Sequence, residues 1–260
     1  MRSKRIEKIR DYIYLNKTVT LDRICEQFDI SKSTLRRDLE EILQSGDIKK
    51  IYGGVTVLPQ TCALPISQRQ LISFKERNIA NPEAKRKIAS AAADLVKEGD
   101  IIFLDSGTTT LPVIDFITKK KRVTILTNNV EIILRAIPYE NINIISLSGT
   151  LSRKTLSFTG ATAEQVLQHY NISKAFMATT GFSVSNGVTN SSPVESEIKR
   201  TAVQRSQHVY LLADSSKFNA VSLVTYCDLN QIDLLITEKE PTSDIRDYLE
   251  QNGKQILIAQ

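Results

Sequence analysis

A run of small polar residues at positions 105–110 is the part of this chain best suited to hold an anion. It reads Asp105-Ser106-Gly107-Thr108-Thr109-Thr110, and a helix is expected to begin at Leu111. Glycine lets the backbone approach a ligand closely, the threonines offer hydroxyl groups, and N–H groups at a helix start favour negative charge. The same residues could serve only to cap that helix. Taken alone, the run supports both interpretations equally.

Four further polar loops follow predicted strands in the same half of the chain. They read Thr127-Asn128-Asn129, Ser148-Gly149-Thr150, Thr179-Thr180-Gly181-Phe182-Ser183 and Asp214-Ser215-Ser216-Lys217-Phe218. In an open parallel sheet, loops at the carboxyl ends of the strands converge on one edge, where ligands bind. Together the five loops favour binding of a phosphorylated, hydrophilic molecule over helix capping.

The candidate effector-binding residues come from these loops and from one predicted helix start. Lys217 could neutralise a phosphate or form an internal ion pair. Glu195 follows Pro193 and could accept hydrogen bonds from ligand hydroxyls or cap its own helix. The full set is Asp105, Ser106, Gly107, Thr108, Thr109, Thr110, Asn128, Gly149, Gly181, Glu195 and Lys217.

A basic, hydroxyl-rich segment near the N-terminus has the composition of a DNA-recognition helix. It reads Ser31-Lys32-Ser33-Thr34-Leu35-Arg36-Arg37-Asp38-Leu39. At about 100° per residue, Leu35 and Leu39 define the buried side, so Ser33 and Arg37 point away from it. Arginine pairs bidentately with guanine, and serine or threonine hydrogen-bonds to bases or phosphates.

Residues 48–57 form two apolar-rich runs around Gly53-Gly54, which predicts a hairpin. A hairpin after a helix-turn-helix is a wing, whose polar side chains contact the DNA backbone without reading sequence. The candidate DNA-binding residues are therefore Lys32, Ser33, Thr34, Arg36, Arg37, Lys49, Lys50 and Tyr52. A small helical interaction domain is the alternative interpretation of this region.

Apolar spacing predicts the helices that position the recognition segment. Ile6, Ile9 and Ile13 recur on one helical face, and residues 21–28 repeat that pattern. Thr20 and Ser31 are expected to cap the second and third helices, and Gly46 to end the third. Two helices joined by a tight turn, the second basic at its start, match the helix-turn-helix plan.

The rest of the chain alternates predicted helices and strands. A helix is expected over residues 83–97, and strands over 101–105, 123–127, 142–147, 175–179, 209–213 and 234–237. This order predicts an α/β domain with a largely parallel sheet. We divide the chain into a winged helix-turn-helix domain (1–58), a linker (59–78) and an effector-sensing α/β domain (79–260). The end of the linker is expected to be helical or to pack across the second domain.

Composition limits the chemistry that the chain could perform. Its 260 residues are 41% hydrophobic and 24% charged, as in ordinary globular proteins. No Walker A or G-x-G-x-x-G pattern is present, the two histidines (His169, His208) are isolated, and the three cysteines form no C-x-x-C pair. We therefore expect no metal, no cofactor and no disulfide.

Charge and hydropathy indicate the compartment and the partner. No apolar run reaches the roughly 18 residues that a membrane span needs, and no apolar segment follows the basic N-terminus, so we expect a cytoplasmic protein without a membrane partner. Residues 1–60 hold 12 Lys or Arg and 9 Asp or Glu, a surplus of 3 within the net charge of +5. That surplus weakly favours an anionic partner, although a solvated helical surface explains it about equally well.

The motifs in the N-terminal segment resemble the DNA-binding domain of the DeoR family of bacterial transcription regulators. Thr34-Leu35-Arg36-Arg37-Asp38-Leu39, Gly46 and Tyr52-Gly53-Gly54 carry this resemblance, which extends to about Glu238. Tyr52 stands where the family usually has histidine, and Lys50 where it usually has arginine. The resemblance implies a double-stranded DNA operator, a phosphorylated sugar effector and a homodimer or tetramer.

The C-terminal half is similar to the sensor domain of that family, which itself resembles the fold of ribose-5-phosphate isomerase. Residues 106–110 match the isomerase phosphate loop in type, and Glu195 lies within a residue or two of its catalytic glutamate. Its acidic run and its lysine-glycine run are replaced here by residues 179–183 and 187–191, which removes the groups that proton transfer needs. The resemblance therefore implies a non-enzymatic, one-component repressor of sugar-metabolism genes. The alternatives are a sugar-phosphate isomerase-like or acyl-transfer enzyme fused to a DNA-binding module, and a purely structural nucleoid or adaptor protein with a relict pocket.

Overall fold

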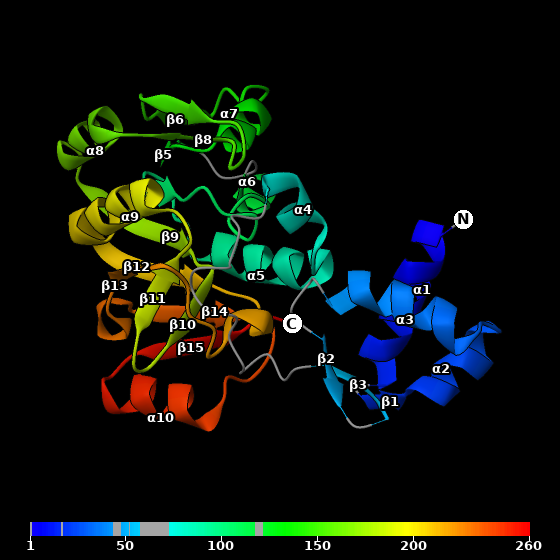
Figure 1. The fold of residues 1–260 in the computed structure, drawn as a ribbon. Helices are drawn as coiled ribbons and strands as arrows, with labels where there is room; N and C mark the ends of the chain where they lie inside the picture. Colours follow the sequence, from blue (N-terminus) through cyan, green and yellow to red (C-terminus); the bar gives the residue numbers. More distant parts are fainter. Residues whose placement is uncertain (1, 17, 44–47, 52, 58–72, 118–121) are drawn as a thin grey trace. The chain divides into compact units, whose positions relative to one another are not determined.

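The computed structural model describes residues 2–16, 18–43, 48–51, 53–57, 73–117 and 122–260. The chain divides into two compact units, Met1–Gln68 and Arg69–Gln260 (Figure 1). The predicted residues Gly46 and Tyr52 and most of the expected linker lie outside the described residues.

The smaller unit contains three helices and a small antiparallel sheet. Its elements are α1 (Arg2–Asn16), β1 (Thr18–Thr20), α2 (Leu21–Phe28), α3 (Lys32–Leu43), β2 (Ile48–Ile51) and β3 (Gly54–Val57). The strands pair in the order β1-β3-β2. The predicted apolar faces meet in one core, which includes Ile9, Ile13, Ile24, Leu35 and Leu39. This arrangement confirms the winged helix-turn-helix prediction and adds β1, whose three residues are too few to give a pattern.

The larger unit is an α/β domain around a seven-stranded, wholly parallel sheet. The sheet order is β15-β14-β12-β9-β4-β5-β6. The strands are β4 (Ile101–Leu104), β5 (Val123–Thr127), β6 (Ile142–Ser146), β9 (Ile172–Ala178), β12 (Ser206–Leu212), β14 (Leu234–Thr237) and β15 (Gln255–Ile258). Six of them lie where strands were predicted; β15, an edge strand of four residues, was missed.

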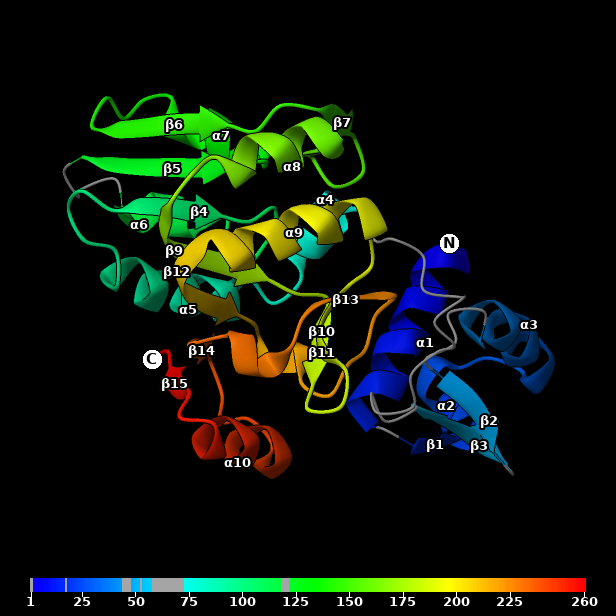
Figure 2. The same cartoon turned by 90° about the vertical axis from the view of Figure 1, so that its left-hand side faces the viewer.

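Helices cover both faces of this sheet (Figure 2). Side chains of α5 (Pro82–Asp94), α6 (Val113–Ile117) and α7 (Val130–Ala136) share one buried cluster with Ile102 and Leu104. Those of α8 (Ala161–Gln168), α9 (Pro193–Arg205) and α10 (Ser243–Gln251) share the other with Phe103. Successive strand residues therefore point to opposite cores, which explains why these strands are continuous apolar runs.

The strand order reverses between β4 and β9. From β4 the chain adds β5 and then β6 on one side, then returns to place β9 on the other side of β4. In open α/β sheets, ligands bind beside such a reversal, at the carboxyl ends of the two central strands. Residues 105–110 follow β4 at this point.

Three smaller features complete the larger unit. The short helix α4 (Phe74–Ile79), at the end of the expected linker, packs into the α5–α6 core through Phe74. A hairpin joins β7 (Thr150–Ser152) to β8 (Ser157–Thr159). A second sheet has the order β10-β11-β13, with β10 (Gly181–Ser183), β11 (Gly187–Asn190) and β13 (Val224–Cys227).

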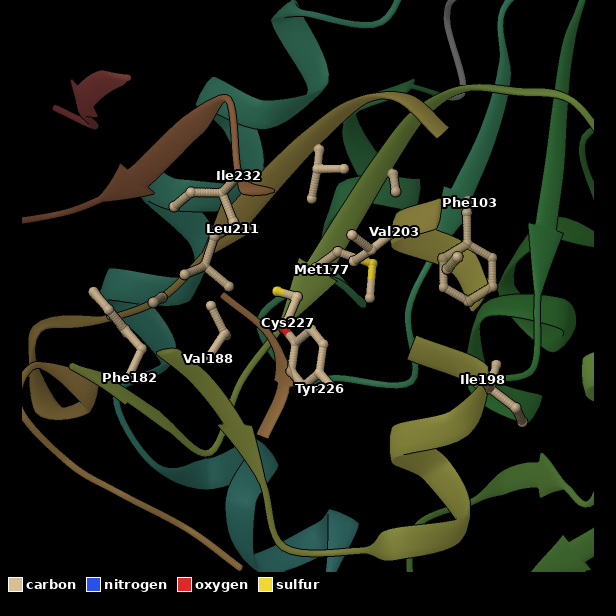
Figure 3. Packing of buried hydrophobic residues seen from close by; sticks show 14 of the residues in the cluster. Phe103, Met177, Phe182, Val188, Ile198, Val203, Leu211, Tyr226, Cys227 and Ile232 are labelled. Atoms are coloured by element: carbon tan, nitrogen blue, oxygen red, sulfur yellow. The ribbon is translucent and has the colours of Figure 1, made fainter. Parts of the chain in front are cut away.

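The second sheet packs against the main sheet through apolar side chains. Phe182, Val188 and Tyr226 meet Met177 and Leu211 of the main sheet in the cluster drawn in Figure 3. The Tyr226 hydroxyl also donates to the Ala178 carbonyl at 3.0 Å. These contacts fix the end of β9 beside the loop that follows β4.

Candidate anion site and nucleic-acid interface

The helix-turn-helix is formed by the predicted caps and one left-handed residue. Thr20 caps α2 by accepting the N–H of Arg23, and the Ser31 hydroxyl accepts the N–H of Thr34 at 3.3 Å. Between the helices Asp29 has φ 48°, and its N–H and that of Ile30 donate to carbonyls at the end of α2. The turn thereby satisfies backbone groups that the helix end leaves open.

The start of α3 presents a polar, basic face. Lys32, Ser33, Arg36 and Arg37 are exposed and Thr34 is half-buried, whereas the apolar residues of α3 are buried. Lys32 forms an exposed ion pair with Asp22 of α2 at 2.6 Å. The buried Asp38 accepts two hydrogen bonds from Arg5 of α1, at 2.8 and 3.2 Å. Asp38 therefore ties α3 to α1 and leaves the outer face to the other polar residues.

The wing, formed by β1, β3 and β2, depends on close packing at Gly54. An added Cβ on Gly54 would lie 2.4 Å from the Val19 carbonyl oxygen, so only glycine allows β3 to approach β1 this closely. Lys49 and Lys50 are exposed on β2, while the third predicted wing residue, Tyr52, is outside the described residues. The described candidates for DNA binding thus lie on the first turns of α3 and on β2.

Residues 105–110 form a buried loop whose own side chains hold its shape. The Thr110 hydroxyl donates to the Asp105 carbonyl at 2.6 Å and accepts the Gly107 N–H at 3.2 Å. Asp105 Oδ1 accepts the Ser106 N–H at 2.8 Å. Asp105 Oδ2 accepts the Ala178 N–H at 2.8 Å and also the Lys199 ammonium. The carboxylate therefore joins the ends of β4 and β9 to α9.

Gly107 is required where the loop meets β9. An added Cβ would lie 2.1 Å from the Ala178 Cβ, a separation at which the loop or the strand must move. The loop then turns so that the N–H groups of Thr108, Thr109 and Thr110 have no acceptor among the described residues. Three neighbouring unpaired N–H groups are the arrangement that binds an anion.

Glu195 lies beside this loop rather than capping its own helix. Ser192 caps α9, and the buried Glu195 carboxylate accepts hydrogen bonds from Ser157 at 2.7 Å and Ser106 at 3.5 Å. Because β8 carries Ser157, the β7–β8 hairpin holds the carboxylate in place. A carboxylate at this place could accept hydrogen bonds from the hydroxyl groups of a ligand.

The other predicted residues are distributed around the sheet edge. Asn128 donates to the Phe158 carbonyl at 3.1 Å, and its buried Oδ1 has no partner in the described residues. Gly149 packs against Thr159 of β8. No hydrogen bond or ion pair in the described residues joins Gly149, Gly181 or Lys217 to residues 105–110.

Lys217 belongs to a second cluster of charged residues, which lies at the end of β12 and includes Asp214 and Lys85. Lys217 lies in a short helical turn, Ser215–Lys217, capped by Asp214. Burial opposes ionisation of Asp214, but hydrogen bonds from Ser216 and the charge of Lys217 prevail and lower its pKa. Burial, together with the nearby Lys217 and Arg77 charges, lowers the pKa of Lys85 to about 8 despite the opposing charge of Asp214.

Sequence reasoning missed three residues of this region. Arg77, in α4, interacts electrostatically with Glu195 and Asp105; burial is the main reason why its pKa is lowered. Lys85 donates to the Arg77 carbonyl, and Ser157 holds Glu195. The sequence signal for Arg77 was its basic side chain in the segment Phe74-Lys75-Glu76-Arg77, which was expected to be helical or to pack across the second domain. Nothing in the local sequence marks Ser157, whose partner lies 38 residues away.

Cysteine and histidine are further reactive side chains in the described residues. Burial raises the pKa of the Cys227 thiol to about 12, so it stays protonated. His169 and His208 are exposed. No group of three or more His, Cys, Asp or Glu in the described part of the chain could hold a metal. None of the described helices combines the length and apolarity that a membrane crossing requires.

Comparison with protein families gives two matches that together span most of the chain. Residues 5–61 match the DeoR-like helix-turn-helix domain. Residues 80–239 match the DeoR C-terminal sensor domain.

Curated relatives align over nearly their whole length. The HTH-type transcriptional regulator IolR of Bacillus subtilis is 38% identical over 100% of both chains. The HTH-type transcriptional repressor GlcR of the same organism is 29% identical over 99% of this chain and 96% of its own. The transcriptional repressor AccR of Agrobacterium fabrum is also 29% identical, over 99% of this chain and 96% of its own. All three are named as regulators or repressors, in line with the expectation that the chain is not an enzyme.

Among solved structures, a D-ribose-5-phosphate isomerase in complex with phospho-erythronic acid is similar to part of the chain. The TM-score is 0.40 and the identity 17%, over 52% of this chain and 53% of that one. The similarity thus covers about half of each molecule.

Proposed function

The chain belongs to the DeoR family of transcriptional regulators, and we propose that it is a repressor whose affinity for a double-stranded operator is controlled by a phosphorylated sugar. One observation carries the effector part of this proposal. The adjacent N–H groups of Thr108, Thr109 and Thr110 have no acceptor among the described residues, and they lie in a loop whose Ser106 contacts the buried Glu195 carboxylate. The first feature suits a phosphate and the second suits sugar hydroxyls.

The DNA part rests on the exposed residues at the start of α3. In helix-turn-helix proteins these first turns enter the major groove, where arginine can pair with guanine. We assign base contacts to Ser33, Thr34, Arg36 and Arg37, and backbone contacts to Lys32, Lys49, Lys50 and Tyr52. Two recognition helices on a two-fold operator need at least a dimer, so we propose a homodimer or tetramer.

The effector must bind the DNA-competent and DNA-incompetent states with different affinities, because otherwise it would not shift the equilibrium between them. The proposed effector-binding set keeps Asp105 and Thr110 as residues that shape the loop. It assigns the anion to the N–H groups of residues 108–110 and the sugar to Glu195 and Asn128. Lys217 contributes positive charge at the same sheet edge.

The test begins with thermal shift of the full chain against a panel of aldose and ketose phosphates and the matching unphosphorylated sugars. We expect at least one sugar phosphate to raise the melting temperature, and its sugar not to. A footprint with and without that compound should then show release of the operator. No response to any phosphate would contradict the effector assignment. Interconversion of aldose and ketose phosphates would favour the alternative of an isomerase fused to a DNA-binding module.

A further inference from the structure

The β7–β8 hairpin covers the two side chains that the proposed function assigns to the sugar. Its Ser157 hydroxyl donates to Glu195 Oε1 at 2.7 Å. The Phe158 N–H donates to the Asn128 carbonyl at 2.8 Å, and the Asn128 side chain donates to the Phe158 carbonyl at 3.1 Å. Glu195 is 5% exposed and Asn128 is 1% exposed, so a sugar can reach either side chain only after a movement that uncovers it.

The hairpin is held by polar rather than apolar packing. Its two strands pair over only three residues each. The side chains that it buries are those of Thr155, Ser157 and Thr159, which all carry hydroxyl groups, whereas Leu156 and Phe158 are half-buried. A segment with few buried apolar contacts opens at a lower free-energy cost than the strands and helices of a core. The hairpin is therefore a part of the larger unit that can open by itself.

The closed hairpin leaves two buried amide atoms without partners. Asn129 lies directly opposite Ser157 in an antiparallel bridge, which places their side chains on the same face. The Asn129 side-chain oxygen caps α7, but its Nδ2 has no partner among the described residues, and neither has Asn128 Oδ1. Buried groups that lack partners oppose the closed position, because opening returns them to water or gives them to a ligand.

A glycine stands at each end of the hairpin, in a conformation that other residues rarely adopt. Gly149 has φ 129° and Gly160 has φ 114°. An added Cβ on Gly160 would meet no atom within 4 Å, so the backbone conformation alone calls for glycine there. Leu156, in the turn of the hairpin, also has a positive φ, 52°, which strains a bulky residue. Hinges are such element-terminal positions, because they absorb changes of backbone angle.

We propose that the β7–β8 hairpin is a flap over the effector site, hinged at Gly149 and Gly160. The hydrogen bond from Ser157 to Glu195 latches it. Opening frees the Glu195 carboxylate and the two amides beneath the hairpin, which then bind the sugar, with Asn129 Nδ2 donating to one of its oxygens. This inference rests on the proposed function and deepens it. Since only open molecules admit the sugar, the apparent affinity is reduced by the fraction of molecules that are open.

Native-state hydrogen exchange of the ligand-free full chain tests the latch. The Phe158 and Val130 N–H groups donate where the hairpin meets the end of β5, whereas the Leu147 N–H donates to β5 itself. We expect Ser157→Ala to speed exchange of the first two roughly 10- to 100-fold, as loss of a hydrogen bond to a charged group does. Leu147 should exchange as in wild type. Unchanged exchange at Phe158 and Val130, or an equal increase at Leu147, would overturn the inference.

The same measurement tests the hinge with a matched pair of glycines. Gly99 has φ 84° and equally open surroundings, but it lies outside the hairpin. Alanine is disfavoured at a positive φ, and opening lets a hinge residue leave that conformation. Gly160→Ala should therefore speed exchange of the Phe158 and Val130 N–H groups roughly 5- to 30-fold. Gly99→Ala should leave it unchanged, and equal behaviour of the two variants would show that residue 160 is not a hinge.

Titration calorimetry then connects the flap to the effector, using the sugar phosphate that stabilises wild type most. Ser157→Ala should bind it more tightly than wild type, by the factor by which exchange increases, because more molecules are open. A hydroxyl that only shaped the site would give weaker binding on removal, and weaker or unchanged binding would overturn the inference. Failure of wild type to bind any sugar phosphate would instead refute the proposed function, while the exchange measurements would still decide whether the hairpin opens.

Discussion

Both oxygens of the Asp105 carboxylate accept hydrogen bonds from within the protein. Its oxygens accept the N–H groups of Ser106 and Ala178 and the ammonium of Lys199, and the side chain is 1% exposed. An acidic residue next to an anion site would repel its ligand if it were unpaired. Here Lys199 neutralises it, so the residue fixes the loop without opposing an anion.

Asp105→Asn should destabilise the larger unit. It leaves the Lys199 ammonium buried without its counter-charge, and breaking a buried pair costs about 3–5 kcal/mol. Denaturant unfolding of the full chain measures the change. The matched control is Glu197→Gln, which removes an exposed ion pair with Arg200 and should cost at most about 1 kcal/mol. Equal effects of the two variants would show that the buried pair has no special role.

Gly107→Ala tests whether loop shape depends on the contact with β9. The new Cβ would lie 2.1 Å from that of Ala178, and such overpacking costs about 1–3 kcal/mol. We expect a lower melting temperature and lost binding of the stabilising sugar phosphate. The double variant Gly107→Ala/Ala178→Gly removes the opposing methyl group and should recover both. If it does not, the contact is not the reason that glycine is needed.

Arg37→Ala tests the assignment of base contacts. If Arg37 reads a base, specific binding should weaken by about 1–3 kcal/mol while random DNA is bound almost as before. Lys50→Ala on β2 is the comparison: it should weaken both DNAs equally and lower the salt dependence by about one ion. Fluorescence anisotropy at several salt concentrations measures both. An equal loss on operator and random DNA would assign Arg37 to phosphate contacts.

At the scale of elements, the long, regular segments were predictable. The caps of α2 and α3 follow from Thr20 and Ser31, whose hydroxyls compete well for helix-start N–H groups. The parallel strands follow from continuous apolar runs, because both faces of the sheet are buried. The predicted loop at residues 105–110 lies at the strand-order reversal, as expected for a ligand site in such a sheet.

Short elements with long-range partners were not predictable. The helix α4 has six residues, too few for a helical period, and the charge of its Arg77 interacts with Asp105 and Glu195 far along the chain. The contact of Ser157 with Glu195 depends on the β7–β8 hairpin, whose three-residue strands give no pattern. Sequence spacing therefore identified the loop that forms the candidate site but not the side chains that surround it.

Burial of Lys85 on α5 makes the stability of the larger unit depend on pH in the alkaline range. Burial lowers the pKa of Lys85 to about 8, so the folded chain loses this proton more readily than the unfolded chain does. Between about pH 8 and the ordinary lysine value near 10.5, the unfolded state binds more protons, so Lys85 makes stability increase with pH in that range. Below pH 8 this contribution is a constant penalty.

Lys85→Met should remove that contribution. Thermal melts of wild type and Lys85→Met at pH 7.5, 9 and 10 measure it as the difference between the two proteins at each pH. We expect the melting temperature of wild type to rise relative to that of Lys85→Met as the pH increases. The exposed Lys87→Met on the same helix is the control and should track wild type at every pH. A difference that does not change with pH would contradict a lowered pKa at Lys85.

At the scale of the whole molecule, the proposed function requires a coupling free energy between two sites in separate units. If the sugar phosphate lowers operator affinity by a given factor, then operator DNA must lower sugar phosphate affinity by the same factor. Allosteric couplings are typically about 5- to 150-fold. Calorimetry measures the sugar phosphate affinity with and without saturating operator, and anisotropy measures the operator affinity with and without saturating sugar phosphate. The two affinity ratios should therefore be equal. Because this equality is thermodynamic, it holds whichever elements carry the signal.

The double variant Thr109→Ala/Lys217→Ala tests whether that coupling originates at the proposed site. Its sugar phosphate affinity should fall, and the concentration that releases the operator should rise by the same factor, because both report one binding event. Unequal factors would mean that the two residues affect the coupling as well as the binding. Release at the wild-type concentration would mean that neither the Thr109 hydroxyl nor the Lys217 charge contributes to binding of the ligand.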